Sequence, residues 1–254
     1  MRTTPRVDVL GVGISVVDTG AALEAIGGWI ERRQPNYVCV TGVHGVMECQ
    51  RDAELLGVHN RSGLTLPDGM PMVWAGRRAG AGGMSQVRGS DLMLAVLAMS
   101  AVRGWSSFLY GGAPGVPERL AARLGERYPG LRIAGGYSPP FRPLTPREDT
   151  EIVDRINASG AELVWVGLST PKQERWMAEH RSRLTAPVLL GVGAAFDMHA
   201  GLVRQAPTWM QRRGLEWSYR VAKEPRRLLL RYLRNNPAYL VHTAIRRPFL
   251  VDAE

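Results

Sequence analysis

Short apolar segments alternate with segments of helical pattern along most of this chain, and this alternation limits the fold more than any other feature. The apolar segments are brief and often rich in valine, as buried strands are. Strands are expected at residues 7–10, 37–41, 106–110, 132–135, 163–167 and 188–192, and helices at 21–33, 47–61, 90–102, 116–128, 147–158 and 172–183. Such an alternation predicts an α/β fold with a Rossmann-like, largely parallel sheet flanked by helices.

The pattern changes after about Ala206, where the strands stop and helices are expected at 208–223, 225–234 and 237–247. This part is also strongly basic. Residues 204–254 hold eleven basic and four acidic side chains, so +7 of the net charge of +9 lies in the last fifth of the chain. We therefore predict an α/β core at residues 1–205 and a helical, basic C-terminal appendage at residues 206–254.

Composition excludes several classes of protein. With 254 residues and 45% hydrophobic content, the chain can bury a sizeable core. Its uncharged runs at 92–102 and 184–196 are shorter than the roughly 20 apolar residues that a membrane-spanning helix needs. No secretory signal is expected, because Asp8 interrupts the first apolar stretch. Cys39 and Cys49 have no metal or redox spacing, which favours buried thiols in a reducing compartment.

Five cations of the appendage recur every three or four residues, a helical period that puts all five on one side, and this phase is kept across the helix break expected at Pro225. They are Arg220, Lys223, Arg227, Arg231 and Arg234. A solvated face is the ordinary interpretation of a charge run, but an anionic membrane surface would attract each cation by roughly 1 kcal/mol. Nucleic acid is not expected as a partner, because the appendage has no helix-turn-helix or zinc pattern.

Ligands of open α/β sheets bind at the carboxyl ends of the strands, and two segments there carry suitable groups. Gly111 and Gly112 begin a glycine-rich turn into a helix, where backbone N–H groups can approach phosphate. Lys172 and Gln173 follow another expected strand, close to two hydroxyl side chains. A plain tight turn and a helix cap are the structural alternatives.

Two carboxylates, a histidine and a tyrosine are further candidates. Asp68 lies in a Pro-Asp-Gly turn and is either a turn residue or a general base, which typically contributes on the order of 10²–10⁴ in rate. Asp197 is the other acidic candidate near a strand end. His44 stands just past a strand, where a structural role and a site role are equally compatible with the sequence. Tyr137, in the proline-rich loop 136–146, is a candidate for substrate binding.

Seven short motifs follow one another along nearly the whole chain, from about Val7 to Leu233. They are LPDG at 66–69, VRGSDL at 87–92, FLYGGAPG at 108–115, YPGL at 128–131, VGLSTPKQE at 166–174, APTWMQ at 206–211 and GLEW at 214–217. Each is modest alone, but together and in order they are highly specific. The chain resembles the WecG/TagA/CpsF glycosyltransferase family.

This resemblance implies an inverting, metal-independent transfer of a hexose from a UDP-sugar to a polyprenyl-diphosphate-linked sugar. Asp68 matches the proposed general base, and Thr41, Arg88 and Gln173 match pocket residues near the donor. Neither a metal nor another cofactor is expected, since the chain has no Asp-x-Asp pair and its five histidines make no ligand spacing. Arg88 and the appendage arginines would then stabilise the diphosphate charge.

The appendage arginines Arg220, Arg227 and Arg231 match those thought to close over the site at the membrane. The resemblance thus implies a peripheral enzyme on the cytoplasmic face of the membrane, in surface polysaccharide or teichoic-acid-like synthesis, with homo-oligomerisation left open. One departure concerns the donor sugar. Val43 stands where many members carry asparagine, and His44 is a candidate to replace that contact. N-acetylmannosamine, its uronic acid, glucose, mannose and other hexoses stay open.

Two other functions are compatible with the sequence. A non-catalytic protein could bind a membrane surface, or nucleic acid, through the basic appendage. A nucleotide-dependent oxidoreductase would bind NAD(P), although the segment Gly11-Val12-Gly13 lacks the third glycine of a dinucleotide fingerprint and is interpreted as a strand end.

Overall fold

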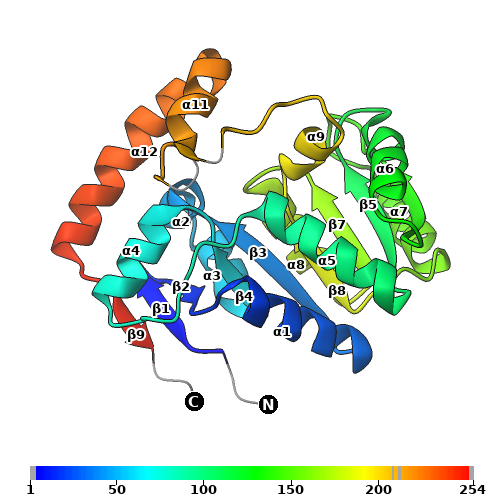
Figure 1. Ribbon diagram of the computed structural model, residues 1–254, viewed down its shortest axis with the longest axis horizontal. Coiled ribbons are helices and arrows are strands. Elements are labelled where there is room, and N and C mark those ends of the chain that lie inside the picture. The colour runs from blue at the N-terminus through cyan, green and yellow to red at the C-terminus, as the bar shows by residue number, and fades with distance from the viewer. Residues whose placement is uncertain (1–3, 208, 211–212, 252–254) are drawn as a thin grey trace.

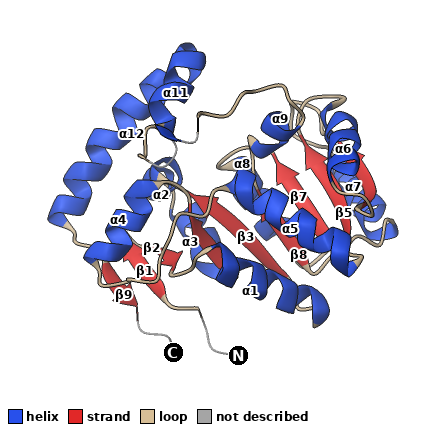
Figure 2. Cartoon of the chain, in the orientation of Figure 1, coloured by secondary structure: helices blue, strands red, loops and turns tan. Residues whose placement is uncertain are grey.

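The computed structural model describes residues 4–207, 209–210 and 213–251, except for the side chains of Arg220 and Arg227. Its central element is a six-stranded sheet in the order β4-β3-β8-β7-β5-β6, in which neighbouring strands are parallel (Figure 2). The strands are β3 (Asn36–Thr41), β4 (Leu64–Pro67), β5 (Ser106–Gly111), β6 (Arg132–Tyr137), β7 (Leu163–Gly167) and β8 (Val188–Gly191). The predicted α/β class is confirmed.

Alternate residues of the central strands enter two separate cores. In β7, Leu163 and Trp165 pack on one face, and Val164 and Val166 pack on the other. The first core includes residues of α1 (Thr19–Glu31), α5 (Gly89–Arg103) and α6 (Val116–Arg127), and the second includes residues of α3 (Ala53–Arg61), α7 (Pro146–Ala158) and α8 (Lys172–His180). Figure 1 shows α1 and α5 lying across one face of the sheet. Because both faces are buried, the strands are continuous apolar runs in the sequence.

The prediction of a single helix at 47–61 is wrong. The chain forms α2 (Val43–Cys49) and α3 instead, and the Asp52 side chain accepts a hydrogen bond from the Leu55 N–H at 3.0 Å. Aspartate in this position caps the first turn of a new helix, which favours a break over a continuous helix. Two short helices, α4 (Met70–Arg78) and α9 (Ala195–His199), lie in segments for which no helix was expected.

The expectation that strands stop after Ala206 is wrong for the last described residues. β9 (Phe249–Val251) pairs with β1 (Arg6–Val9), whose other edge pairs with β2 (Val12–Ser15), all antiparallel. Gly11, at φ +87°, makes the turn between β1 and β2, so this segment is a hairpin and not a strand end. The edge of β1 offers unpaired backbone groups, and only the tertiary fold brings β9 to them. The first and last strands therefore lie side by side (Figure 1).

The helices expected at 225–234 and 237–247 are one helix, α12 (Pro225–Ile245), with Pro237 inside it. Leu228 and Tyr239, on either side of this proline, are both buried, and the Tyr239 hydroxyl donates to the Pro71 carbonyl at 3.3 Å. α12 packs against α2. A proline inside a helix costs about 3 kcal/mol, and burial of side chains on both sides of Pro237 offsets that cost.

The helix expected at 208–223 is interrupted. Residues 209–210 are helical, a turn follows at Arg213-Gly214, and α11 spans Glu216–Lys223. Gly214 takes φ +71°, a conformation that suits glycine and ends the preceding segment. Residues 208, 211 and 212 of the expected helix lie outside the described residues.

Candidate active site

A pocket lies at the carboxyl edge of the central sheet. Residues at or just after the ends of five strands line it, namely Val40, Asp68, Gly112, Gly167 and Gly191. The C-terminal segment contributes Gly214, Glu216, Trp217, Arg231, Tyr232 and Asn236. The cavity volume is ≈ 290 Å³, near the lower end of small-molecule sites. Parallel sheets bind their ligands at this edge, so the pocket is the candidate active site.

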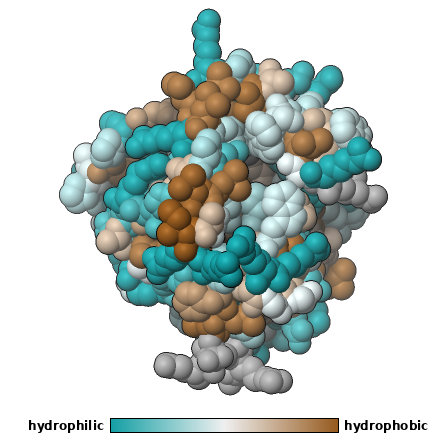
Figure 3. Space-filling view, turned by 90° about the vertical axis from the view of Figure 1, so that its left-hand side faces the viewer, coloured by the Kyte–Doolittle hydropathy of each residue, from teal (hydrophilic) through white to brown (hydrophobic). Residues whose placement is uncertain are grey.

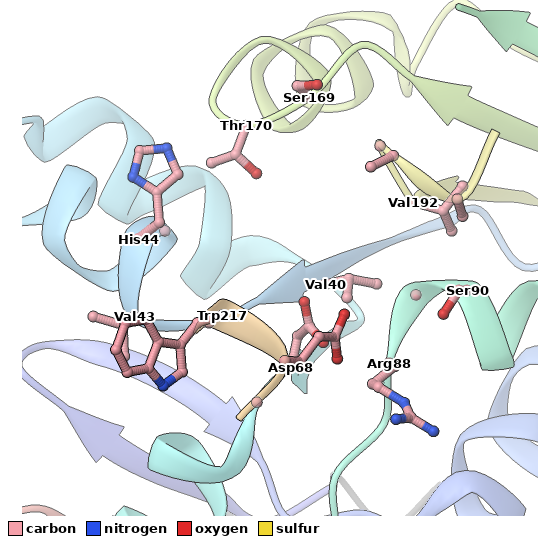
Figure 4. A pocket seen from close by; sticks show the side chains of 18 of the residues that line it. Val40, Val43, His44, Asp68, Arg88, Ser90, Ser169, Thr170, Val192 and Trp217 are labelled. Atoms are coloured by element: carbon pink, nitrogen blue, oxygen red, sulfur yellow. The ribbon is translucent and has the colours of Figure 1, made fainter. Parts of the chain in front are cut away.

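Asp68 follows β4 directly and lines the pocket, half-buried. Its backbone N–H donates to the Thr41 carbonyl of β3 at 2.9 Å, which extends the pairing of the two strands by one residue. Gly69 then turns the chain at φ +101° into α4. Asp68 and Val40 both belong to the pocket lining (Figure 4). The carboxylate is thus held by regular backbone structure on both sides.

A glycine on the neighbouring strand end makes room for this turn. A Cβ atom on Gly42 would lie 2.5 Å from the Asp68 carbonyl oxygen. No side chain tolerates that approach to a backbone atom. Gly42 therefore allows the ends of β3 and β4 to meet where Asp68 enters the pocket.

Arg88 precedes α5 and lines the pocket beside Ser90. Its guanidinium pairs with Asp91, and the Nε–H donates to Asp91 Oδ2 at 2.7 Å. Figure 4 shows the Arg88 guanidinium directed away from Asp68. Asp91 thus sets the orientation of this arginine in the structure, and a contact between Arg88 and a diphosphate stays a prediction.

Gln173 enters the pocket from the first turn of α8, next to Ser169 and Thr170. The neighbouring Glu174 is fully buried, and its Oε1 accepts hydrogen bonds from Thr170 Oγ1 at 2.8 Å and Gln173 Nε2 at 3.0 Å. Gln173 Oε1 is buried and has no hydrogen-bond partner among the described residues. Glu174 thereby fixes which end of the Gln173 amide is left to accept a hydrogen bond. Lys172 is exposed and is not among the described residues that line the pocket.

We expect Glu174→Ala to lower the free energy of unfolding by roughly 3 kcal/mol, because it leaves the buried Gln173 donor and the partly buried Thr170 donor without an acceptor and opens a cavity. Glu174→Gln keeps an acceptor oxygen and should cost less than about 1.5 kcal/mol. Denaturant unfolding measures both values. Glu179→Ala, an exposed position on the same helix, is the control. Equal losses for Glu174→Ala and Glu179→Ala would contradict this account.

His44 projects from α2 into the pocket opposite Thr170 (Figure 4). Its Nδ1 lies 3.1 Å from Asn235 Nδ2 of α12. Burial, together with the nearby charges of Arg231 and Arg51, lowers the pKa of His44 to about 4. The imidazole is therefore neutral near pH 7.

Three other candidates lie outside the pocket lining that the structure describes. Thr41 Oγ1 is buried and has no hydrogen-bond partner among the described residues, although the next residue lines the pocket. A Cβ on Gly111 would lie 2.7 Å from the Gly167 backbone, so this glycine serves the close approach of β5 and β7. Tyr137 ends β6 and stacks on Tyr110 at 6.3 Å between ring centroids. Gly112 does line the pocket.

Asp197 lines the pocket half-buried, but its position is not a strand end as expected. β8 ends at Gly191, and Asp197 lies in α9.

Arg231 reaches the pocket from α12. Arg220 and Arg227 lie on α11 and α12, but their side chains are outside the described part of the structure. Among the candidate arginines, therefore, the structure brings Arg88 and Arg231 to the pocket.

Several lining residues were not among the candidates. Trp217 belongs to the GLEW motif at 214–217, so that motif could have identified it. Ser169 and Thr170 are the two hydroxyl side chains expected near Lys172 and Gln173, and both line the pocket. Asn236 lines the pocket from a helix that no strand-end rule covers. Its position depends on how α12 packs against the core.

Cys39 and Cys49 are buried free thiols, as predicted. In the described part of the chain, no helix is both long and apolar enough to cross a membrane. Within the same residues, no group of three or more histidine, cysteine, aspartate or glutamate side chains is arranged to hold a metal ion.

The fold and the pocket define an α/β protein with a pocket at the carboxyl ends of its parallel strands. The family model for the glycosyl transferase WecG/TagA/CpsF family matches residues 7–250 of the chain. The chain belongs to this family, and is a glycosyltransferase of cell-surface polysaccharide synthesis.

Proposed function

We propose that the protein transfers a hexose from a UDP-sugar to a sugar carried on a polyprenyl diphosphate, with inversion and without a metal ion. One observation carries the proposal: Asp68 of the core and Arg231 of the C-terminal helix line the same pocket. A base for the acceptor hydroxyl and a cation for the leaving diphosphate are thus available in one cavity. Family membership supplies the reaction class.

In the proposed step, Asp68 accepts the proton of the acceptor hydroxyl. The hydroxyl oxygen forms a bond to the anomeric carbon while the bond from that carbon to the UDP oxygen breaks, and the configuration inverts. The UDP that leaves gains negative charge, which Arg231 and Arg88, both in the pocket lining, would stabilise. Arg220 and Arg227 are proposed to add to this stabilisation.

The C-terminal helix also offers a surface for the membrane that carries the acceptor. α12 exposes six large apolar side chains, which we call the apolar patch: Leu229, Leu230, Leu233, Leu240, Val241 and Ile245. Arg226 and Arg234 are exposed on the same helix. Figure 3 faces this side and shows apolar areas next to hydrophilic ones. Apolar side chains with interspersed cations suit the interface of an anionic leaflet, here the cytoplasmic one.

A panel of UDP-sugars offered with a polyprenyl-diphosphate sugar tests the proposal. We expect UDP release with one or a few donors, only when the acceptor is present, and undiminished in EDTA. Loss of activity in EDTA that a divalent ion restores would overturn the metal-independent step. Vesicle binding without UDP release for any pair would favour a non-catalytic membrane protein, and tighter binding of NAD(P) than of UDP would favour an oxidoreductase.

A further inference from the structure

A chain of three hydrogen-bonding side chains links the C-terminal helix to the pocket. Arg51 follows α2, Asn235 is buried on α12, and His44 lies in the pocket wall. Arg51 Nη2 donates to Asn235 Oδ1 at 3.0 Å, and Asn235 Nδ2 lies 3.1 Å from His44 Nδ1. In the sequence, Arg51 is 184 positions and His44 is 191 positions away from Asn235.

The donor and acceptor roles in these hydrogen bonds follow from Arg51. A guanidinium can only donate, so the Asn235 atom that faces Arg51 must be the amide oxygen. The other end of the amide, its NH₂ group, then faces His44 Nδ1 and donates to it. Nδ1 therefore carries a lone pair, and in a neutral imidazole the proton must be on Nε2. The pKa of His44, which burial and the neighbouring arginines lower, agrees with a neutral ring.

Glu48 is a nearby group that could reverse this assignment. Its Oε1 lies 3.6 Å from His44 Nδ1, beyond hydrogen-bond distance, and it accepts from Arg51 Nη1 at 3.0 Å. Asn235 is the nearer partner of Nδ1. Arg51 thus holds both Asn235 and Glu48 in orientations that leave Nδ1 as an acceptor.

We propose that His44 binds the donor substrate as an Nε2–H donor, and that Asn235 of the C-terminal helix fixes this tautomer. The partner would be an acceptor oxygen, on either the diphosphate or the hexose. This inference rests on the proposed function for the identity of the ligand. His44 thereby acts as a substrate-binding residue, and Asn235 and Arg51 act as positioning residues. Val43, next to it in the pocket wall, has no hydrogen-bonding side chain.

The tautomer can be measured in the wild-type protein without any ligand. Ring ¹⁵N spectra distinguish a protonated nitrogen from one with a lone pair, and comparison with His44→Phe identifies the signals of His44 among the five histidines. At pH 7 we expect Nε2 to be protonated and Nδ1 to be an acceptor. A proton on Nδ1, or a doubly protonated ring, would overturn the proposal.

Asn235→Asp tests the role of the C-terminal helix. A carboxylate accepts hydrogen bonds only, so it can still pair with Arg51 but requires a proton on His44 Nδ1. We expect the Nδ1 signal to move to that of a protonated nitrogen. Ala244→Asp adds the same charge at an exposed position of α12 and should leave the His44 tautomer unchanged. An unchanged Nδ1 in Asn235→Asp would show that Asn235 does not set the tautomer.

Titration calorimetry with UDP, UDP-glucose and UDP-N-acetylglucosamine tests the ligand role. His44→Phe keeps an aromatic ring but has no donor, and we expect about fivefold to tenfold weaker binding, as for one hydrogen bond. An equal loss for UDP and the UDP-sugars places the partner oxygen on the diphosphate, and a loss for a UDP-sugar alone places it on the hexose. No loss with any probe refutes the donor role. If the wild-type protein binds none of the three, the proposed function and the ligand role both fail, while the tautomer result stands.

Discussion

The Asp68→Asn variant is expected to bind UDP like the wild-type protein and to transfer sugar about 10²- to 10⁴-fold more slowly. Asparagine has nearly the same size and shape as aspartate, and the backbone contacts that hold this turn do not involve the carboxylate. Its amide cannot accept the proton of the acceptor hydroxyl, so the contribution of general base catalysis is lost. The kcat for UDP release, the Kd for UDP and the Tm separate these effects.

Asp197 provides the comparison, because it is a second carboxylate in the lining of the same pocket. If Asp68 is the base, Asp197→Asn should change kcat much less than Asp68→Asn does. Near wild-type turnover of Asp68→Asn with a large loss in Asp197→Asn would transfer the role to Asp197. Weak UDP binding by Asp68→Asn would instead indicate that Asp68 holds the donor and does not act on the acceptor.

Replacing Leu230 and Leu233 by glutamate is expected to weaken binding to phosphatidylglycerol vesicles by at least about 100-fold. The two side chains are 75% and 61% exposed, so the folded protein loses little when they change. Burial of a leucine in an apolar phase contributes roughly 1.5–3 kcal/mol, and the new carboxylates are repelled by anionic lipid. Vesicle co-sedimentation measures the affinity, and an unchanged Tm and UDP affinity would show that the fold is intact.

A matched double variant, Val102→Glu with Phe141→Glu, adds the same two charges at exposed apolar positions outside the C-terminal helix. It should bind vesicles as the wild-type protein does. Equal losses in the two double variants would mean that net charge, and not the apolar patch, determines binding. Unchanged binding of the Leu230 and Leu233 variant would show that α12 does not contact the membrane through these side chains.

The local parts of the fold could be predicted because their causes are local. Leu163 to Gly167 form an apolar run whose side chains are buried on both faces of the sheet. The sequence of this segment alone therefore predicts the strand. Asp68 and Gln173 follow strands, and the strand-end rule was enough to place them at one edge. The same rule also selected Lys172, which does not line the described pocket, since the rule does not say toward which side a residue turns.

Other features depend on contacts between distant parts of the chain. Pro237 remains inside α12 because Leu228 and Tyr239, on either side of it, are both buried. No local pattern could show that β9 would pair with β1.

The sequence by itself determined the layered α/β core and the edge at which the pocket lies, because apolar periodicity and chain direction act within each segment. Only the tertiary structure decided which nitrogen of His44 accepts a hydrogen bond, since Asn235 is 191 residues away and reaches it only when α12 packs on α2. A hydrogen bond has a direction that depends on the position of both partners, and the sequence contains no signal for a pair that the fold alone brings within 3.1 Å.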